Sequence, residues 1–477
     1  MTNIHIVHRA IRIHDNTSLI AQMKEQTSVI VIFIFTPEQI NPKKNKYFSN
    51  NSVQFMIESL KELATTIHDK GGKMLFFYGD VVKVLKTLHK LVPINSISFN
   101  YEYTPYGRER SNNINMFAKS NNITVYEKED YALYDILPGD TLKADKTPYL
   151  VYTPYMKHLT TNLKVRSIDR YNKFAFTNIK QYHDSKYHMD IKEIDNFYDV
   201  NVNINVNGGR SNSLKILKNM GKFKDYTKMR DYLVYNTTFL GASNHFGTVS
   251  IREVYNSMVE NLEKNATGLI RELIWRQFYM ELTYHFPKIL QGMVTKHKNS
   301  SLKEKYDNIK WSYNKSNFKK WCLGMTGHPI VDAAMRQMNT TGFMHNRARM
   351  ITVSFCVKNQ HIDWRWTEMY FATKLCDYDP MSNSGGHQWV AGCGSDAQPW
   401  FRIFNPWTQQ KDYDPDCTYI KKWIPELQTV PAKDIHKWNE PEIHEKYIKM
   451  GVQYVAPILD VSIERKNTIS IYTAALK

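Results

Sequence analysis

Three segments of the sequence carry polar and aromatic side chains at spacings that could act together on a ligand. The first covers residues 268–286, and the residues found there at i, i+3, i+4 and i+7 are Glu272, Trp275, Arg276 and Tyr279. This spacing puts a carboxylate, a guanidinium and two aromatic rings on one face of a predicted helix, apart from its apolar stripe. The face suits a flat, hydrogen-bonding ligand, although an ordinary exposed ion pair between Glu272 and Arg276 is the simpler interpretation of the composition alone.

The second segment, residues 326–355, indicates two helices broken by a glycine. In the later helix Asn346 and Met350 lie one turn apart, while Arg347 and Arg349 diverge to their flanks. A neutral amide beside two guanidinium groups suits an anionic, hydrogen-bonding ligand. A solvated basic helix accounts for the same pattern, so both interpretations stay open at this point.

The third segment, residues 375–392, crowds Asp377, Asp379 and Asn383 into a predicted Gly-rich turn. A calcium loop starting at Asp377 would need Gly at its sixth position and Glu at its twelfth, and the sequence has serine and glutamine there. We therefore expect no metal site in this segment. Its carboxylates and amide are instead candidates for hydrogen bonds to a ligand.

The overall composition indicates what kind of ligand the chain binds. The chain has 63 Lys and Arg against 46 Asp and Glu, a net charge of +17, and 13% aromatic residues. An excess of this size favours an anionic partner, such as nucleic acid or an anionic membrane surface. Residues 395–409 combine Arg402 with Trp400 and Trp407, as proteins that bind single strands or flipped bases do.

The same inventory excludes several classes of protein. The first thirty residues contain no cationic start followed by an apolar stretch, so we expect no secretory signal. The most apolar run, residues 28–35, is far shorter than the roughly 20 residues that span a bilayer. We expect a soluble, intracellular protein without membrane contact. Five scattered cysteines without zinc spacing favour free, buried thiols in a reducing compartment: Cys322, Cys356, Cys376, Cys393 and Cys417.

Residues 1–130 alternate apolar runs with amphipathic ones, which predicts a parallel α/β sheet. No G-x-G-x-x-G or P-loop motif is present, so the sequence marks no phosphate site in this part. The predicted strands are Ile4–Val7, Val29–Phe35, Lys73–Tyr78, Ser96–Tyr101 and Ile123–Tyr126. The predicted helices are Asn16–Lys24, Asn51–Lys70, Val81–Leu91 and Arg108–Ser120.

Beyond residue 130 the pattern changes twice. Residues 131–211 indicate an inter-domain connection, and it ends in the polar run NVNINVNGGRSNS (201–213), which we expect to be unpacked. Residues 212–477 have amphipathic helices and no clear strands, which predicts an all-α domain. The predicted helices include Tyr226–Tyr235, Ser250–Lys264, Gly268–His285, Lys315–Leu323, Pro329–Thr341, Met344–Lys358 and Trp364–Leu375.

The chain resembles the photolyase/cryptochrome family of blue-light flavoproteins in five runs, which follow the family's order and spacing. These runs are ELIWRQFY, TGHPIVDAAMRQ, GFMHNRARMI, DYDPMSNSGGHQW and FRIFNPWTQ. The runs IRIHDNTSLI (11–20) and YTKMRDY (226–232) also resemble family motifs. The motifs are most similar to those of class I cyclobutane pyrimidine dimer photolyases. The resemblance implies a Rossmann-like α/β domain at residues 1–130, a connection at 131–211 and an all-α FAD-binding and lesion-binding domain at 212–477.

The resemblance also implies an FAD cofactor that is active as FADH⁻. Arg347, paired with Asp377, would lie near the isoalloxazine ring, and Asn383 would face flavin N5, where a neutral amide can steer protonation. Hydroxyls and backbone amides of the TTFLG loop would hold the pyrophosphate and ribityl chain. The complete implied set is Tyr226, Thr237, Thr238, Leu240, Gly241, Arg276, Arg347, Asp377, Asp379 and Asn383.

On the lesion side, the resemblance implies that Glu272 hydrogen-bonds the thymine edge and stabilises its negative charge. Trp275 and Trp389 would pack a flipped dimer from two sides, and Met350 would touch it from beneath. Photolyases for the (6-4) product have a second His where this chain has Asn346. The residues implied to grip DNA phosphates are Arg230, Arg349 and Arg402.

Two departures from the family pattern affect light capture and electron supply. His387 replaces the flavin-proximal Trp of the usual electron-transfer triad. Trp364 and Trp321 match the two outer positions of the triad, although both could equally well be ordinary aromatic residues of the hydrophobic core. Because imidazole is much harder to oxidise than indole, we expect slow or rerouted photoreduction with repair intact. Tyr106 and Gly107 replace the Asn and Glu of folate-binding members, so we expect no folate antenna, while a deazaflavin, another antenna or none stay open.

The sequence thus predicts an enzyme of the deoxyribodipyrimidine photo-lyase type. It would act as a monomer on ultraviolet-damaged DNA, passing an electron from excited FADH⁻ to a flipped cyclobutane pyrimidine dimer. The alternatives are a cryptochrome-type blue-light photoreceptor and an enzyme that repairs the (6-4) photoproduct. The presence of Glu272, Trp275, Asn346, Met350 and Trp389 favours the dimer-repair enzyme.

Overall fold

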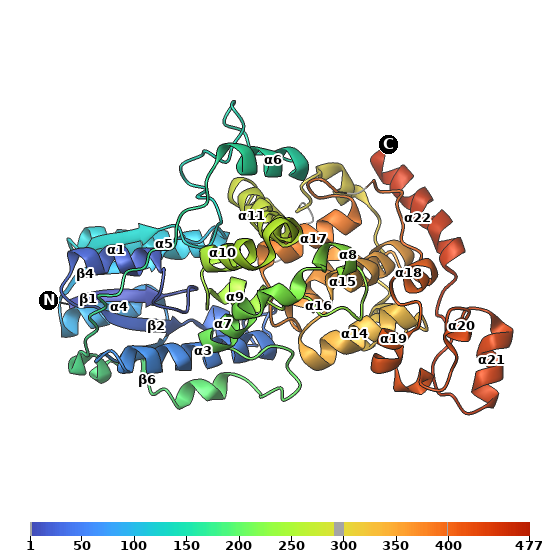
Figure 1. Ribbon diagram of the computed structural model, residues 1–477, viewed down its shortest axis with the longest axis horizontal. Coiled ribbons are helices and arrows are strands. Elements are labelled where there is room, and N and C mark those ends of the chain that lie inside the picture. The colour runs from blue at the N-terminus through green and yellow to red at the C-terminus, as the bar shows by residue number, and fades with distance from the viewer. Residues whose placement is uncertain (1, 291–299, 398) are drawn as a thin grey trace. The chain divides into compact units, whose positions relative to one another are not determined.

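The computed structural model describes residues 2–290, 300–397 and 399–477, and these divide into two compact units (Figure 1). Unit 1 consists of Met1–Val202, Val206–Lys224 and Thr238–Pro287. Unit 2 consists of Asn203–Asn205, Asp225–Thr237 and Lys288–Lys477. Each unit has its own core.

Unit 1 is built on a six-stranded sheet in the order β5-β4-β1-β2-β3-β6. Strands β1 to β5 are parallel, and the short β6 pairs with β3 in the antiparallel sense. The predicted parallel α/β fold is therefore confirmed. The strands are β1 (Thr2–Val7), β2 (Ile30–Phe35), β3 (Met74–Tyr78), β4 (Ile94–Asn100), β5 (Thr124–Lys128) and β6 (His188–Met189).

Helices cover the sheet and are started by side-chain caps (Figure 1). Helix α1 packs against β4 and β5, α3 packs against β3, and α4 packs beside α5. Asn16, Ser49, Asp80 and Thr104 each accept a hydrogen bond from the first turn of their helix, which satisfies an otherwise unpaired N–H. These helices are α1 (Thr17–Glu25), α3 (Asn50–His68), α4 (Val81–Leu91) and α5 (Pro105–Ser120).

The polar run at residues 201–213 differs from the sequence-based expectation, because its end is packed. The backbone N–H of Gly208 donates to Glu58 Oε2 at 2.6 Å, and that of Gly209 donates to Ser59 Oγ at 2.8 Å. A Cβ on Gly208 would lie 2.2 Å from the Phe55 carbonyl oxygen, so glycine permits this close approach to α3. The expectation of an unpacked run was wrong here.

Unit 1 also contains helices that precede and follow residues 201–213 in the sequence. Helix α6 (Tyr152–Asn162) lies within the predicted connection, for which we predicted no helix, and it packs against α11. The remaining helices of eight or more residues are α7 (Arg210–Lys218), α10 (Ile251–Leu262) and α11 (Thr267–His285). The short helices are α2 (Pro37–Ile40) and α9 (Gly241–Phe246).

Four charged side chains of unit 1, each 1–2% exposed, form a buried ion network of Arg12, Asp15, Asp130 and Arg252. Arg12 donates to Asp130 at 2.6 Å, while Arg252 donates to Asp130 at 2.8 Å and to Asp15 at 2.7 Å. Burial alone would raise the pKa of Asp130, but the two guanidinium groups hold it well below its usual range. Because Arg252 lies on α10, the network ties that helix to the loops after β1 and β5.

Unit 2 is helical, and its core gathers around Trp321, Trp364 and Trp438. Residues 380–391 form a helix, so the predicted Gly-rich turn was wrong; Asp379 caps this helix by accepting from two backbone N–H groups. The helix predicted from Tyr226 ends at Met229. The helices of unit 2 are α8 (Tyr226–Met229), α13 (Lys315–Leu323), α14 (Pro329–Thr341), α15 (Asn346–Ser354), α16 (Trp364–Ala372), α17 (Pro380–Ala391), α18 (Pro406–Tyr413), α19 (Thr418–Trp423), α20 (Ala432–Ile435), α21 (Pro441–Lys449) and α22 (Val461–Leu476).

Within the described ranges, no helix is long and apolar enough to cross a membrane. The same residues contain no group of three or more His, Cys, Asp or Glu placed to hold a metal ion. All five cysteines are buried, and none of them forms a disulfide bond.

Asp130→Asn tests how strongly the buried ion network holds unit 1. The substitution leaves two guanidinium groups without their shared carboxylate, so we expect the free energy of unfolding in urea to fall by about 3–5 kcal/mol at neutral pH. The pKa of Asp130 is lower in the folded than in the unfolded chain. Its contribution to stability is therefore present above the ordinary value of 3.8 and disappears as the pH falls below it.

The matched control is Asp169→Asn, which breaks the exposed pair between Lys24 and Asp169, whose side chains are 53% and 41% exposed. This change should cost about 1 kcal/mol or less. Equal losses in the two variants would contradict the role given to the buried network.

Candidate functional site

The predicted ligand face of α11 is present in unit 1 and is supported from behind by an aromatic ring. The Trp275 ring stacks on Tyr152 of α6, with centroids 3.6 Å apart and planes within 3° of parallel. The Tyr152 hydroxyl donates to the Arg271 carbonyl at 2.8 Å, and Phe278 meets Trp275 edge-on. One face of Trp275 is thus occupied by protein, which fixes the orientation of a partly exposed ring.

Arg276, one residue further along α11, joins that helix to two other parts of unit 1. Its guanidinium donates to the backbone carbonyls of Tyr131 at 2.7 Å and Asn244 at 3.0 Å. Glu272 lies one turn earlier and is partly exposed. Arg276 therefore does more than form a surface ion pair, which was the simpler interpretation of the sequence.

The segment expected to hold the cofactor's phosphates leads into α9. Thr237 and Thr238 are partly exposed, Leu240 is the buried residue before the helix, and Gly241 is exposed at its start. The Thr238 hydroxyl accepts from the Leu240 N–H at 3.4 Å. The Asn244 side-chain oxygen is buried and has no hydrogen-bond partner among the described residues.

In unit 2, α15 begins at Asn346 and presents it to solvent, with the partly exposed Met350 one turn on. His345 is the buried cap of this helix, and its Nδ1 accepts from the Arg347 N–H at 3.2 Å. Burial lowers the pKa of His345 to about 4, so the imidazole is neutral near pH 7. The motif therefore exposes an amide and hides its only imidazole.

The two arginines of α15 have partners other than those expected. Arg349 binds Asp377 with one nitrogen 3.0 and 2.9 Å from the two carboxylate oxygens, and its Nε donates to the Met344 carbonyl. Arg347 pairs with Asp231 at 2.8 Å and lies over the Tyr413 ring. The expected pairing of Arg347 with Asp377 was wrong, because residues two apart on a helix point about 200° apart and only Arg349 faces Asp377.

Helix α17 carries Asn383 and, one turn later, His387. The Asn383 amide donates to the Glu368 side chain at 2.8 Å and to its backbone carbonyl at 3.2 Å, so the orientation of the amide is fixed from α16. His387 is buried, and its Nδ1 lies 2.8 Å from the Asn383 carbonyl. Burial lowers the pKa of His387 to about 4, which leaves this imidazole neutral.

Glu368 is a buried carboxyl that sequence reasoning missed. Burial raises its pKa to about 8, against the opposing hydrogen bonds from Asn383 and Tyr378. Both donors reach Oε1, whereas Oε2 is buried without a partner in the part of the chain that the structure describes. This arrangement fits a neutral acid whose proton is on Oε2.

The three residues considered for electron transfer all lie in the core of unit 2. Trp321 stacks on Phe371 with centroids 6.0 Å apart, and Phe371 meets His387 edge-on at 5.0 Å. Trp364 has the guanidinium of Arg365 4.8 Å from its ring centroid. Trp321 and Trp364 belong to the same hydrophobic core cluster. The electron route itself stays a prediction.

The remaining expected site residues differ in exposure. Tyr226 is buried at the start of α8, and Arg230 at the end of that helix is partly exposed. Trp389 on α17 is partly exposed. Arg402 is exposed on a turn before α18, and it can therefore reach a ligand in solution.

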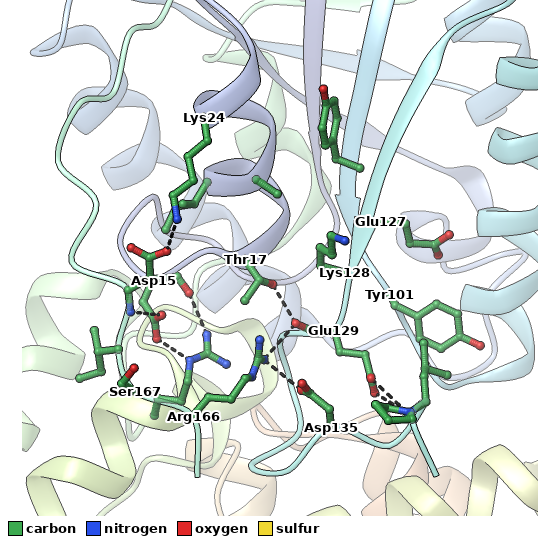
Figure 2. A pocket seen from close by; sticks show the side chains of 18 of the residues that line it. Asp15, Thr17, Lys24, Tyr101, Glu127, Lys128, Glu129, Asp135, Arg166 and Ser167 are labelled. Carbon is green, nitrogen blue, oxygen red and sulfur yellow. Dashed lines mark hydrogen bonds and ion pairs between the residues drawn. The ribbon is translucent and has the colours of Figure 1, made fainter. Parts of the chain in front are cut away.

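A separate pocket of about 1220 Å³ opens in unit 1 beside α1 and the carboxyl ends of β4 and β5 (Figure 2). Its charged side chains largely satisfy one another: Lys24 binds Asp169 at 2.9 Å and Arg166 binds Asp135 at 3.0 Å. None of the residues expected at the flavin or lesion site lines it. We therefore treat this pocket as separate from the candidate site.

Comparison with known proteins decides the family. Residues 3–172 match the family model described as DNA photolyase, and residues 269–474 match the FAD binding domain of DNA photolyase. A deoxyribodipyrimidine photo-lyase of Alkalihalophilus pseudofirmus is 33% identical over 97% of this chain and 96% of its own. The chain belongs to the DNA photolyase family. The resemblance found in the sequence is thereby confirmed.

Solved structures of photolyases agree with this fold over the whole chain. The archaeal photolyase of Sulfolobus tokodaii, solved with two FAD molecules, has a TM-score of 0.86 at 33% identity and covers 99% of this chain and 100% of its own. A cryptochrome of Synechocystis has a TM-score of 0.88 at 25% identity and covers 98% of this chain and 99% of its own. The predicted fold, an α/β domain with a helical FAD domain, is confirmed, and photolyases share it with a cryptochrome.

The residues of this photolyase-family chain fit a bound FAD. Within unit 2, the Arg347 Nε and the Tyr235 hydroxyl are two of the buried polar atoms that have no hydrogen-bond partner among the described residues. Buried polar groups in native proteins are nearly always satisfied, so such atoms are what a polar cofactor would pair with. Arg347 belongs to the set of residues that the family resemblance implies for the flavin, and Tyr235 lies two residues before Thr237 of that set.

Glu368→Gln tests the neutral carboxyl behind Asn383 in this photolyase-family chain. In the unfolded chain the carboxyl ionises near 4.5, whereas in the folded chain it stays neutral up to about pH 8. The folded state thus binds the extra proton between these values, and the free energy of unfolding should fall as the pH rises. Because glutamine does not ionise, Glu368→Gln should not lose stability in this way. As the pH rises from about 5 to 8, we expect its free energy of unfolding to increase by roughly 2–4 kcal/mol relative to that of the unsubstituted chain.

The measurement is urea unfolding across that pH range. Glu445→Gln, an exposed substitution on α21, is the control and should leave the pH dependence unchanged. A pH dependence shared by the unsubstituted chain and Glu368→Gln would show that Glu368 is not the group responsible.

Proposed function

We propose that this protein repairs cyclobutane pyrimidine dimers in DNA with light as its energy source. Full-length similarity to a deoxyribodipyrimidine photo-lyase supports the activity, and residues 269–474, which match the family's FAD binding domain, support the cofactor. The family's class I remains the nearest by motif. The domain boundaries at residues 130 and 211, a monomeric state and an intracellular location belong to the same proposal.

One observation favours repair of the dimer rather than of the (6-4) product: the exposed amide of Asn346 lies beside the buried imidazole of His345. Repair of the (6-4) product needs proton transfer, for which that branch has a second His. Here position 346 offers an amide, which transfers no proton near pH 7. His345 is 3% exposed, neutral and occupied in capping α15, so it offers no acidic proton to a ligand at the surface.

Bound FAD in its reduced form, FADH⁻, would supply the electron that light drives onto the dimer. Because Arg349 forms an ion pair with Asp377, we propose that this pair contacts the flavin. We no longer expect Arg349 to contact DNA phosphates. Asn383, held by Glu368, would present its amide to flavin N5 in a fixed orientation. Asp379, which caps α17, would keep the start of that helix in place.

On the lesion side, we assign to Trp275 and Trp389 the flat contacts with a flipped dimer and to Met350 a contact on its edge. Glu272 would accept a hydrogen bond from the thymine edge and stabilise the charge that the dimer acquires. Arg230 and Arg402 would contact phosphates. These contacts account for part of the net charge of +17.

The direct test illuminates the reduced, FAD-loaded protein with an oligonucleotide that contains one dimer and measures loss of the dimer. A second oligonucleotide with the (6-4) product is measured separately. We expect loss of the dimer alone, and we expect Glu272→Gln to slow it by about tenfold to a hundredfold with unchanged binding in the dark.

Glu260→Gln, an exposed change on α10, is the matched control and should repair at the unsubstituted rate. Illumination without loss of either lesion would contradict the proposal and favour the alternative, a cryptochrome-type blue-light photoreceptor. Loss of the (6-4) product would contradict the role given to Asn346.

Tyr152→Leu tests whether the ring behind Trp275 matters for lesion binding. Without its stacking partner, Trp275 loses its fixed orientation, and we expect the affinity for dimer-containing DNA in the dark to fall roughly 3- to 10-fold. Tyr152→Phe keeps the ring and loses only the hydroxyl, so it should bind nearly as well as the unsubstituted chain. Titration of a fluorescent oligonucleotide measures both, and equal affinities for all three proteins would refute this role.

A further inference from the structure

The turn at residues 399–402 is anchored from beneath by a buried lysine. Lys358 lies on a π-helical turn (Phe355–Asn359) that continues α15, and it is 0% exposed. Its ammonium donates to the backbone carbonyl of Arg402 at 2.8 Å. Within the described part of the chain, no carboxylate forms an ion pair with this ammonium.

A second contact holds the other side of the same turn. Trp400 stacks on Tyr472 of α22, with centroids 5.9 Å apart and planes 13° from parallel, and the Tyr472 hydroxyl donates to the Ala391 carbonyl. The Arg402 N–H closes the turn by donating to Pro399 at 2.9 Å. Phe401, which is 58% exposed, and the Arg402 side chain then point outward.

A buried amine at this position lowers the stability of the fold unless its contacts offset the loss of hydration. A buried ammonium loses its hydration, and an apolar side chain of similar length would avoid that loss. Burial lowers the pKa of Lys358 to about 7, with a smaller upward effect from Cys393 and a downward one from Arg402. Among the described residues, one contact compensates for this loss, the hydrogen bond from the amine to the Arg402 carbonyl.

We propose that Lys358 is a positioning residue, whose buried amine fixes the turn at residues 399–402 so that the Arg402 guanidinium is presented to a DNA phosphate. The phosphate contact rests on the proposed function, whereas the fixing of the turn does not. Lys358 itself is too deeply buried to touch DNA. Its effect on binding must therefore pass through Arg402.

Trypsin measures the fixing of the turn without DNA or light. Trypsin cleaves after Arg402, and cleavage of a folded protein follows the fraction of molecules in which the site is locally open. We expect Lys358→Met, which keeps the length and removes the donor, to raise cleavage after Arg402 by roughly tenfold. Cleavage after the exposed Arg170 is the internal control and should not change, while Lys358→Arg, which keeps donors, should restore slow cleavage at Arg402.

The effect of the fixed turn on DNA affinity is measured by the binding of a dimer-containing oligonucleotide in the dark. Lys358→Met and Arg402→Ala should each lower the affinity by roughly 3- to 10-fold, and the double variant should bind no worse than Arg402→Ala alone. The exposed Lys319→Met is the matched control for loss of one positive charge. Its effect should be smaller than that of Lys358→Met.

The outcomes separate the two parts of the proposal, which are the fixing of the turn by Lys358 and the contact of Arg402 with a phosphate. Unchanged cleavage after Arg402 in Lys358→Met would overturn the proposal, and so would additive effects on DNA affinity. Faster cleavage together with full affinity in Arg402→Ala would uphold the fixed turn and overturn the phosphate contact, which belongs to the proposed function. If Lys358→Met does not fold, Lys358→Leu, which also lacks a donor, replaces it, and cleavage at the unsubstituted rate would again overturn the proposal.

Discussion

The buried network of Arg12, Asp15, Asp130 and Arg252 is the constraint on which the rest of unit 1 depends. An ion in a protein interior is stable only when its partners satisfy it fully, so these four groups permit one arrangement of the loops after β1 and β5 and of helix α10. The chain approaches closely here: a Cβ on Gly247 would lie 2.7 Å from the Ala10 Cα. Helix α11, with the face that carries Glu272 and Trp275, follows α10 directly in the chain.

Unit 2 keeps several of its buried titratable groups neutral. Burial raises the pKa of Glu368 to about 8 and lowers those of His345 and His387 to about 4. A neutral group leaves no strong field in the surrounding interior. A charged Glu368 directly behind Asn383 would oppose any negative charge next to it. Neutrality there therefore suits a unit that is proposed to bind an anionic, reduced flavin.

Local signals made much of the fold predictable, and long-range packing explains most of the rest. Val81–Leu91 and Pro329–Thr341 were predicted to the residue, since a capping Asp80 and a leading Pro329 mark their starts. Helix α17 was missed because its paired glycines indicate a turn, whereas the Asp379 cap and burial of one face stabilise a helix. The Asp15–Arg252 pair joins residues 237 positions apart, and no local pattern reveals it.

Three of the groups proposed to meet DNA share one feature that their sequence motifs do not show, which is a buried supporting residue. A ring lies behind Trp275, a buried imidazole caps the helix that Asn346 opens, and an amine lies beneath the Arg402 carbonyl. A side chain held in place before binding loses less conformational entropy on meeting its ligand, so more of the contact energy remains as affinity. Substitution of these buried partners should therefore weaken binding although none of them reaches the ligand. The motifs identify the contacts, and the buried partners decide how well the contacts are positioned.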